Sequence, residues 1–218
     1  MEVLLVGNGR ITEALIDRLN KSGDRVYLLT GHRNGKSSQK HVFEKYNFSY
    51  EDDSIKDIFK SIKPDVTSHF DWQKAEQESV RYTTSLINIV TAYSILQQGR
   101  FVYLSSQEVF SGSSPQNLSE SSPTSPKDFR SMAISQWEEI CANYRRNQGL
   151  DIRILRFDHL YCVPEKGRPE VDPCFAMCLE ALRSGRISAN NNEVFSMIFL
   201  KDAVELAYKA IAAPKLEQ

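Results

Sequence analysis

The chain has 218 residues, of which 41% are hydrophobic and 25% charged, and its formal net charge is −1 at pH 7. This length and composition fit one globular domain, or one domain with a small appendage, and exclude a disordered tail, a fibre and a disulfide-stapled miniprotein. The near-zero net charge gives no global electrostatic reason to bind nucleic acid or an anionic membrane, so neither partner is expected. The first apolar run ends at Gly7 and no stretch approaches the roughly 20 apolar residues of a membrane helix, so we expect a soluble, cytoplasmic protein.

Short apolar runs alternate along the chain with segments of helical period, which is typical of a parallel sheet covered by helices. The predicted strands are Val3–Val6, Arg25–Leu29, Asn47–Tyr50, Asp65–His69, Arg100–Leu104 and Asp151–Arg156. The predicted helices carry apolar residues three and four apart, and they are Ile11–Asn20, Ile55–Ile62, Ser79–Gln98 and Ser131–Asn147. The pattern predicts an α/β fold with a doubly wound parallel sheet.

Two segments lack any apolar period. Ser111–Lys127 holds seven serines and three prolines and is predicted to be a long loop. It is either a mobile surface excursion or a wall of the ligand crevice, which in such folds lies at the carboxyl ends of the strands. The second segment, Cys162–Asp172, precedes a predicted helix around Cys174–Ser184. Within that helix Cys174 and Cys178 share a face, which we interpret as a core face because no CxxC or nearby histidine suggests a metal site.

A glycine turn, Gly7-Asn8-Gly9, follows the first strand and opens the first helix. Glycines there allow a sharp turn and a close approach of the backbone to a pyrophosphate, which the helix amino terminus would bind. We therefore expect Gly7, Gly9, Arg10 and Ile11 to contact a dinucleotide. The third glycine position of this fingerprint is Thr12, and a tight turn without a ligand remains the alternative.

The segment after the second strand indicates which dinucleotide is preferred. A carboxylate there would bind the ribose 2′-hydroxyl of NAD, whereas a guanidinium accommodates a 2′-phosphate. No acidic residue occurs between Val26 and Gln39, while Arg33 and Lys36 do. The cofactor is therefore expected to be NADP or NAD, with NADP favoured, unless Arg33 is only a solvated loop residue.

Five further motifs follow in a characteristic order. They are the helix Gly9–Leu19, the strand entry Lys63–Val66, the strand Phe101–Ser106 with Val109, Phe110 and Gly112 after it, the strand end at Arg156 with Leu160-Tyr161, and Phe199–Val204. In these motifs the chain resembles the extended short-chain dehydrogenase/reductase family, the NAD(P)-dependent nucleotide-sugar epimerases and dehydratases. The resemblance runs through nearly the whole chain.

The resemblance implies a Rossmann-type NAD(P)-binding domain over residues 1–161. Residues 162–218 would form a reduced C-terminal substrate lobe, interleaved with the end of the sheet. It also implies a nucleotide sugar or another small molecule as ligand, cofactor contacts from Ser105, and a possible homodimer formed through Ser79–Gln98 and Ser131–Asn147.

The catalytic residues of the family are where the chain departs most from the resemblance. The family uses a Tyr, a Lys four residues later on the same helix face, and a Ser or Thr at the preceding strand end. Ser106 fits the last role. The Tyr position falls at Arg130 and the Lys position at Ile134, or at Phe129 and Ala133 with a shift of one residue. No Tyr-x-x-x-Lys occurs in the chain, which predicts impaired or atypical catalysis.

Three functions remain open on the sequence alone. The first is an NAD(P)-binding relative with impaired catalysis, the second an active enzyme with unusual residues, and the third a non-catalytic interaction module. For the second, Tyr161, His69 or His159 would be the substitute acid or base. Arg130 would then hold a ribose or a phosphate without transferring a proton.

Overall fold

Six strands pair in one parallel sheet, in the order β3-β2-β1-β4-β5-β6. The structure, a computed structural model of the chain, describes residues 1–7, 9–30, 42–47, 54–70, 75–113, 118–157, 159–162, 173–187 and 196–214. The strands of this sheet are β1 Glu2–Val6, β2 Arg25–Thr30, β3 Glu44–Asn47, β4 Val66–His69, β5 Arg100–Ser106 and β6 Ile152–Phe157. Because all neighbours are parallel, their carboxyl ends meet at one edge of the sheet.

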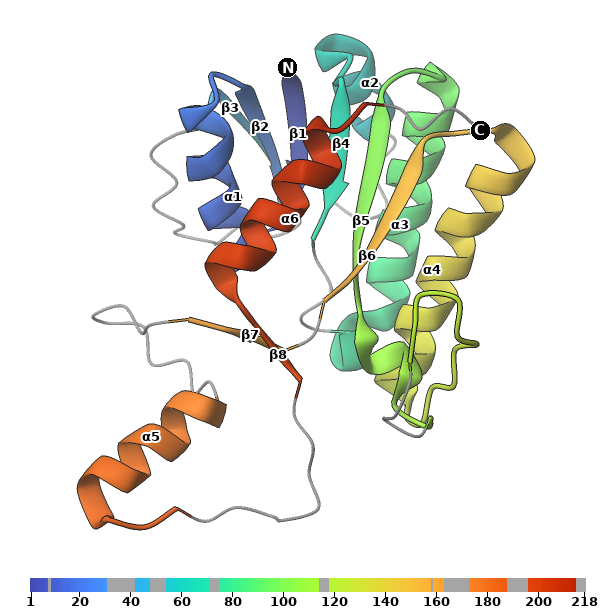
Figure 1. The fold of residues 1–218 in the computed structure, drawn as a ribbon. Coiled ribbons are helices and arrows are strands. Elements are labelled where there is room, and N and C mark those ends of the chain that lie inside the picture. The colour runs from blue at the N-terminus through green and yellow to red at the C-terminus, as the bar shows by residue number, and fades with distance from the viewer. Residues whose placement is uncertain are drawn as a thin grey trace.

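Helices cover both faces of this sheet (Figure 1). One face carries α1 Arg10–Lys21 and α6 Leu200–Ala212, whose apolar side chains share a core with alternate residues of the strands. The other carries α2 Ser54–Ile62, α3 Ala75–Leu96 and α4 Phe129–Gln148. The central strands are buried on both faces, which explains their nearly continuous apolar sequences.

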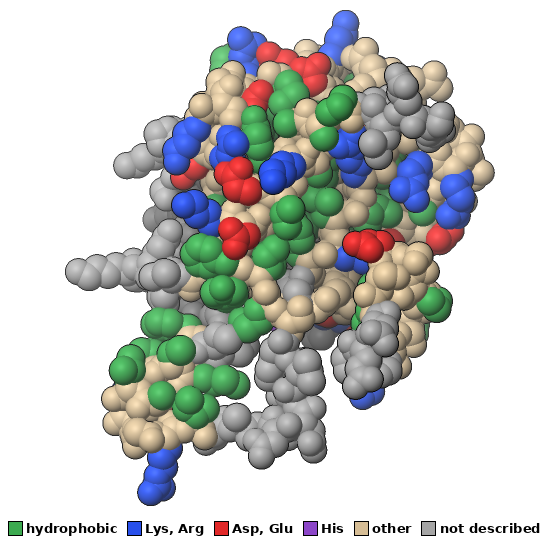
Figure 2. Space-filling view, viewed as in Figure 1, with side chains coloured by type: hydrophobic (Ala, Val, Ile, Leu, Met, Phe, Trp, Pro, Cys, Tyr) green, Lys and Arg blue, Asp and Glu red, His purple; other side chains and the backbone are tan. Residues whose placement is uncertain are grey.

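Four smaller elements lie beyond the carboxyl edge of the sheet (Figure 1). The short 3-10 helix η1, Gln107–Phe110, continues β5 directly. Strands β7 His159–Tyr161 and β8 Met197–Phe199 pair in a separate two-stranded sheet. Helix α5, Pro173–Ser184, stands apart from the main body, and Figure 2 shows apolar side chains gathered on it.

The predicted doubly wound parallel sheet is confirmed, and most predicted elements lie within two residues of the observed bounds. Of the predicted third strand, Asn47–Tyr50, residues 48–50 lie outside the described residues, and β3 begins at Glu44, three residues before the predicted start. It is an edge strand without a continuous apolar run, so neither alternation nor burial marks it in the sequence. The predicted core face shared by Cys174 and Cys178 was also wrong for Cys178, which is exposed on α5.

None of the helices in the described part of the chain is long and apolar enough to cross a membrane. No group of three His, Cys, Asp or Glu side chains gathers there as a metal site would require.

Candidate functional site

The glycine turn lies at the carboxyl end of β1, the middle of the sheet. Gly7 has a φ of 125°, a backbone conformation that side chains with a Cβ rarely adopt, so the turn requires glycine. Gly9 caps the amino terminus of α1 without any side-chain hydrogen bond. Glycine has no side chain that could cap the first amide groups of α1. An anion site at a helix amino terminus requires such amide groups to be left for the ligand.

The residues after Gly9 divide between surface and core. Arg10 is half-buried, and its Nη1 donates a hydrogen bond to Sγ of Cys162, just beyond β7. Ile11 is 2% exposed and belongs to the core, which leaves only its backbone to face a ligand. Thr12 is fully buried, so the helix approaches the sheet closely even though this position lacks a glycine.

Ser106 ends β5 at the same edge as the glycine turn. Its Oγ accepts a hydrogen bond from the Glu108 amide at 3.1 Å and so caps η1. The Glu108 carboxylate in turn pairs with Arg130 on the first turn of α4, with 2.8 Å between Oε2 and Nε. Arg130 thus stands in the expected Tyr position, with its guanidinium held by Glu108.

Ile134, in the expected Lys position, is fully buried in the core between the sheet and helices α3 and α4. The frame shifted by one residue offers no better candidates. Phe129 is 61% exposed and Ala133 lies on the buried side of α4. Neither frame presents an ammonium at the carboxyl edge of the sheet.

A buried polar network lies beside this site. Glu138 is 5% exposed and accepts a two-pronged ion pair from Arg156, with Nε to Oε1 at 2.9 Å and Nη2 to Oε2 at 2.7 Å. Ser105 Oγ also donates to Glu138 Oε1. The network ties β5, β6 and α4 together directly behind Ser106. Ser105 is fully buried, and its hydroxyl is already engaged in this network.

His69 ends β4 but is 3% exposed, and its ring lies 5.9 Å from that of Tyr103. Among the described residues neither ring nitrogen of His69 has a hydrogen-bond partner. Desolvation by burial lowers the pKa of His69 to about 4 and raises the pKa of Tyr103 well above its ordinary value. His69 is therefore a buried neutral imidazole and is not presented to a substrate.

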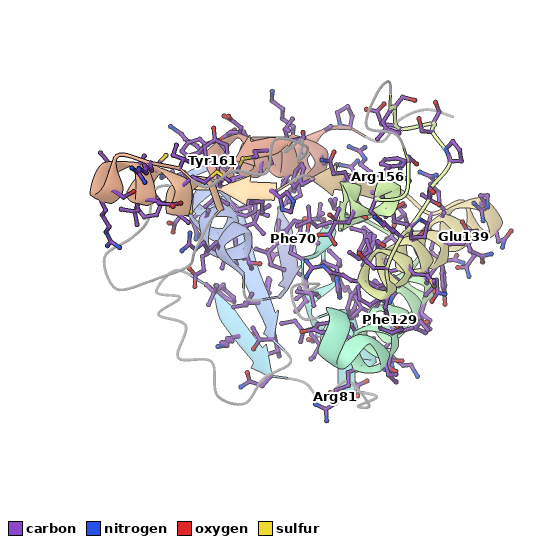
Figure 3. All side chains as sticks on the ribbon, turned by 90° about the horizontal axis from the view of Figure 1, so that it is seen from below. Phe70, Arg81, Phe129, Glu139, Arg156 and Tyr161 are labelled. Atoms are coloured by element: carbon purple, nitrogen blue, oxygen red, sulfur yellow. The ribbon has the colours of Figure 1, made fainter. Side chains whose placement is uncertain are left out.

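Tyr161 and His159 lie on β7, in the separate two-stranded sheet. Seen from below, Tyr161 lies near α5, and Phe70 lies between it and Phe129 (Figure 3). The Tyr161 ring packs 5.3 Å from that of Phe199 and the residue is 38% exposed. The structure thus brings Gly7, Ser106 and Arg130 to one edge, with Tyr161 on the neighbouring small sheet.

The end of β2 bears on cofactor choice. Thr30, its last residue, is 4% exposed and donates a hydrogen bond to Asn47 Oδ1 of β3 at 3.1 Å. Neither strand end carries a carboxylate. Arg33 and Lys36, the basis of the expected NADP preference, lie outside the described residues.

Sequence reasoning missed two carboxylates of this site, Glu108 and Glu138. Each carboxylate forms an ion pair with an arginine that is distant in the sequence: Glu108 with Arg130, and Glu138 with Arg156. A signal existed for Glu138, an acidic residue among apolar neighbours on the buried side of a predicted helix. For Glu108 no local pattern marked it.

Comparison with solved structures shows the same fold in nucleotide-sugar enzymes. The UDP-glucose 4-epimerase of Thermotoga maritima, solved with UDP-glucose, matches 97% of this chain and 74% of its own, at 19% identity and a TM-score of 0.82. The UDP-glucose 4-epimerase of Thermus thermophilus, solved with NAD, matches 99% and 76%, at 19% identity and a TM-score of 0.80. The UDP-N-acetylglucosamine 4-epimerase of Bacillus cereus matches 100% and 76%, at 19% identity and a TM-score of 0.74.

At this level of identity the solved structures show the fold alone. A comparison with proteins of curated function finds no match. The sequence profile of the NAD dependent epimerase/dehydratase family matches residues 3–218, nearly the full chain and all the elements described above. The chain therefore belongs to the NAD dependent epimerase/dehydratase family.

Proposed function

We propose that this chain is an NAD(P)-binding protein of the nucleotide-sugar epimerase/dehydratase type in which catalysis by the usual route of the family is impaired. The observation that carries the proposal is the pair of residues on α4. An arginine held by Glu108 and a buried isoleucine occupy the positions where the resemblance places a phenol and an ammonium. Losing a positioned acid or base typically lowers the rate roughly 10²–10⁴-fold.

The glycine turn fits a dinucleotide. Gly7 has a positive φ at the carboxyl end of β1, and Gly9, the amino-terminal cap of α1, makes no side-chain hydrogen bond to the helix. Gly9 and the backbone at Arg10 and Ile11 would contact the pyrophosphate. The cofactor would supply hydride transfer, and the chain's own residues would bind and orient it.

We further propose that NADP binds more tightly than NAD. Arg33 and Lys36 follow β2, and Thr30 with Asn47 leaves the adjacent strand ends without a carboxylate that would repel a 2′-phosphate. Nucleotide sugars are the proposed second ligand, which Tyr161 and the reduced substrate lobe of residues 162–218 would contact.

One observation supports a second candidate, an active but atypical enzyme. The backbone amide of Glu108 donates to Ser106 Oγ, and its half-buried carboxylate pairs with Arg130. A carboxylate has lone pairs that can accept a proton, whereas a guanidinium offers only donors. In this alternative Glu108 would accept the proton of a sugar hydroxyl and Arg130 would hold a phosphate or ribose.

Thermal shift and turnover measurements test these proposals together. The protein is titrated with NAD, NADP, their reduced forms and several nucleotide sugars, because a ligand at 100 times its Kd adds about 2.7 kcal/mol of stability. Stabilisation by NADP above NAD is expected, together with little epimerase or dehydratase turnover. An absence of any shift would favour the interaction module.

Robust turnover by the unmodified protein would contradict impaired catalysis. Two substitutions then identify its base. Loss of that turnover in Glu108→Gln would establish the second candidate, while loss in Tyr161→Phe alone would point to β7. Ser106→Ala reports whether the strand end contributes at all.

We also propose a homodimer formed through α3 and α4. The outer surface of these helices exposes Val80, Ile87, Phe129 and Met132, at 78%, 40%, 61% and 47% respectively. Two cavities of about 290 and 410 Å³ lie along the same groove and share Gln136. Apolar side chains and hollows that follow one helix pair are typical of an interface.

A further inference from the structure

The loop between η1 and α4 has a fixed base and a projecting tip. At the base the Gly112 amide donates to the Ser125 carbonyl at 2.6 Å, and the Ser125 amide donates to the Val109 carbonyl at 2.8 Å. The Lys127 amide donates to Ser111 Oγ at 2.9 Å. The described part of the tip, residues 118–124, therefore projects from a closed stem beside the start of α4 (Figure 1).

The tip contains a tight turn with a serine hydroxyl at its centre. The Ser122 amide donates to the Ser119 carbonyl at 3.0 Å, which closes the turn. Ser122 Oγ accepts a hydrogen bond from the Ser119 amide at 2.9 Å and lies 3.3 Å from Ser119 Oγ. An N–H donor is thus already directed at the Ser122 side-chain oxygen, and a hydroxyl lies beside it.

A guanidinium lies directly behind this turn. Arg156 binds Glu138 through Nε and Nη2, and its remaining Nη1 donates to the Glu120 carbonyl within the turn at 3.3 Å. Its Cζ lies 4.8 Å from the centre of the Phe110 ring. In Figure 3 Arg156 lies beside η1 and the loop that follows it. The ion pair and the ring hold Arg156 so that Nη1 faces the turn.

We propose that Ser122 is a phosphorylation site for a proline-directed serine/threonine protein kinase. Pro123 follows it, and Ser-Pro is the dipeptide that such kinases select. Ser122 Oγ attacks the γ-phosphorus of Mg-ATP, the bond from that phosphorus to the bridging oxygen breaks, and ADP leaves. The hydroxyl proton passes to the kinase base.

The turn is built to receive the product. A phosphoserine carries a charge of about −1.5 to −2 at pH 7 and three acceptor oxygens. The Ser119 amide and the Ser119 hydroxyl are donors beside the Ser122 oxygen, and Arg156 Nη1 donates to the Glu120 carbonyl of the same turn. Charge-assisted hydrogen bonds from the Ser119 donors, and attraction to the nearby Arg156 guanidinium, would lock the turn in this conformation.

The same dipeptide at the base of the loop is placed differently. Ser125 precedes Pro126, but its amide and carbonyl are both engaged in the stem. Its hydroxyl also lies against Gly112, where a Cβ would meet Ser125 Oγ at 2.9 Å. A phosphate there would have to open the stem. The third Ser-Pro, Ser114-Pro115, lies outside the described residues.

Phosphate mapping tests the site. The full chain is incubated with Mg-ATP and a purified proline-directed kinase, and incorporation is located by intact mass and peptide sequencing. One phosphate on Ser122 is expected, retained in the matched control Ser125→Ala and lost in Ser122→Ala. No incorporation, or incorporation that persists in Ser122→Ala, overturns the proposal.

Hydrogen exchange then tests what the phosphate does. The Ser119 and Ser122 amides should exchange roughly tenfold more slowly in the modified protein, as about 1.4 kcal/mol of added local stability would give. The effect should shrink at high salt, because it rests on charge. Unchanged or faster exchange after modification overturns the locked turn.

Discussion

At the scale of residues, the buried Glu138 carboxylate needs its ion pair with Arg156 to remain stable in the folded protein. The Glu138 side chain is 7% exposed, and its two oxygens accept hydrogen bonds from Arg156 and from Ser105. If its partner is removed, a carboxylate stays in a poorly solvated place, which is far more costly than losing an exposed pair. Measuring the free energy of unfolding therefore distinguishes a structural role of this ion pair from a role in catalysis.

The first prediction concerns this pair. Arg156→Gln should lower the free energy of unfolding by about 3 kcal/mol, because Glu138 is left unpaired. Arg146→Gln breaks the exposed pair of the adjacent residue Glu139, where the side chains are 54% and 66% exposed, and should cost below about 1 kcal/mol. Urea unfolding measures both. Equal losses in the two variants would show that Glu138 is effectively solvated.

The second prediction concerns His69. Burial lowers its pKa to about 4 in the folded chain, against 6.5 for the ordinary side chain, so the unfolded chain binds more protons between these values. Stability should therefore fall as the pH drops from about 6.5 to about 4, by about 3 kcal/mol in total. His69→Phe should flatten this slope in urea titrations at successive pH values. Above pH 7 the two proteins should show parallel pH dependence, and an undiminished acid slope in His69→Phe would assign it to other groups.

At the scale of elements, the position of α4 determines whether the missing Tyr and Lys of the family can be introduced by substitution. It begins with a capping box between Asp128 and Ser131 and ends at Gly149 in the left-handed conformation, so its register is fixed at both ends. That register turns Ile134 fully into the core and leaves Arg130 at the edge. Position 130, where the family has Tyr, should therefore tolerate substitution better than position 134, where the family has Lys.

The third prediction follows from this register. Ile134→Lys should destabilise the protein by at least about 3 kcal/mol, because an ammonium would replace a side chain packed among apolar residues. Asn147→Lys, exposed near the end of the same helix, should change stability by no more than about 0.5 kcal/mol. Thermal unfolding of both variants measures this. A stable Ile134→Lys protein would mean that a polar space lies behind α4, and Arg130→Tyr with Ile134→Lys would then be the variant to assay for gained turnover.

The elements also show what the sequence could and could not reveal. Apolar runs such as Leu4–Val6 located the buried strands, and the glycine turn located the start of α1, because both signals are local. The start of strand β3 was predicted three residues too late and the three-residue strands β7 and β8 were missed, since short or edge strands carry little pattern. The pairing of Arg130 with Glu108 required tertiary structure, because each residue alone resembles a solvated charge.

At the scale of the whole molecule, the described residues expose apolar side chains on two helical surfaces. One is helix α5, where Leu182 is 84% exposed; the other is the groove between α3 and α4. The groove runs along two long helices anchored to the sheet through residues such as Leu86 and Trp137. A rigid helix pair gives a better interface than a single helix standing apart from the body, so the groove is where we place self-association.

The fourth prediction is that the protein is a dimer and that its dimerisation depends on this groove. One chain has a mass of 24.9 kDa, so light scattering coupled to size exclusion should give about twice that value. Ile87→Glu with Met132→Glu places carboxylates from both helices in the interface and should yield monomers. In a two-fold dimer the substituted surface of one chain meets the same surface of the other, so the added carboxylates would repel one another. Leu206→Glu is the matched control, since Leu206 is 46% exposed on α6, in the layer on the opposite face of the sheet, and should leave the dimer intact. A dimer that survives the double substitution but dissociates in Leu206→Glu would move the interface to the α1 and α6 layer.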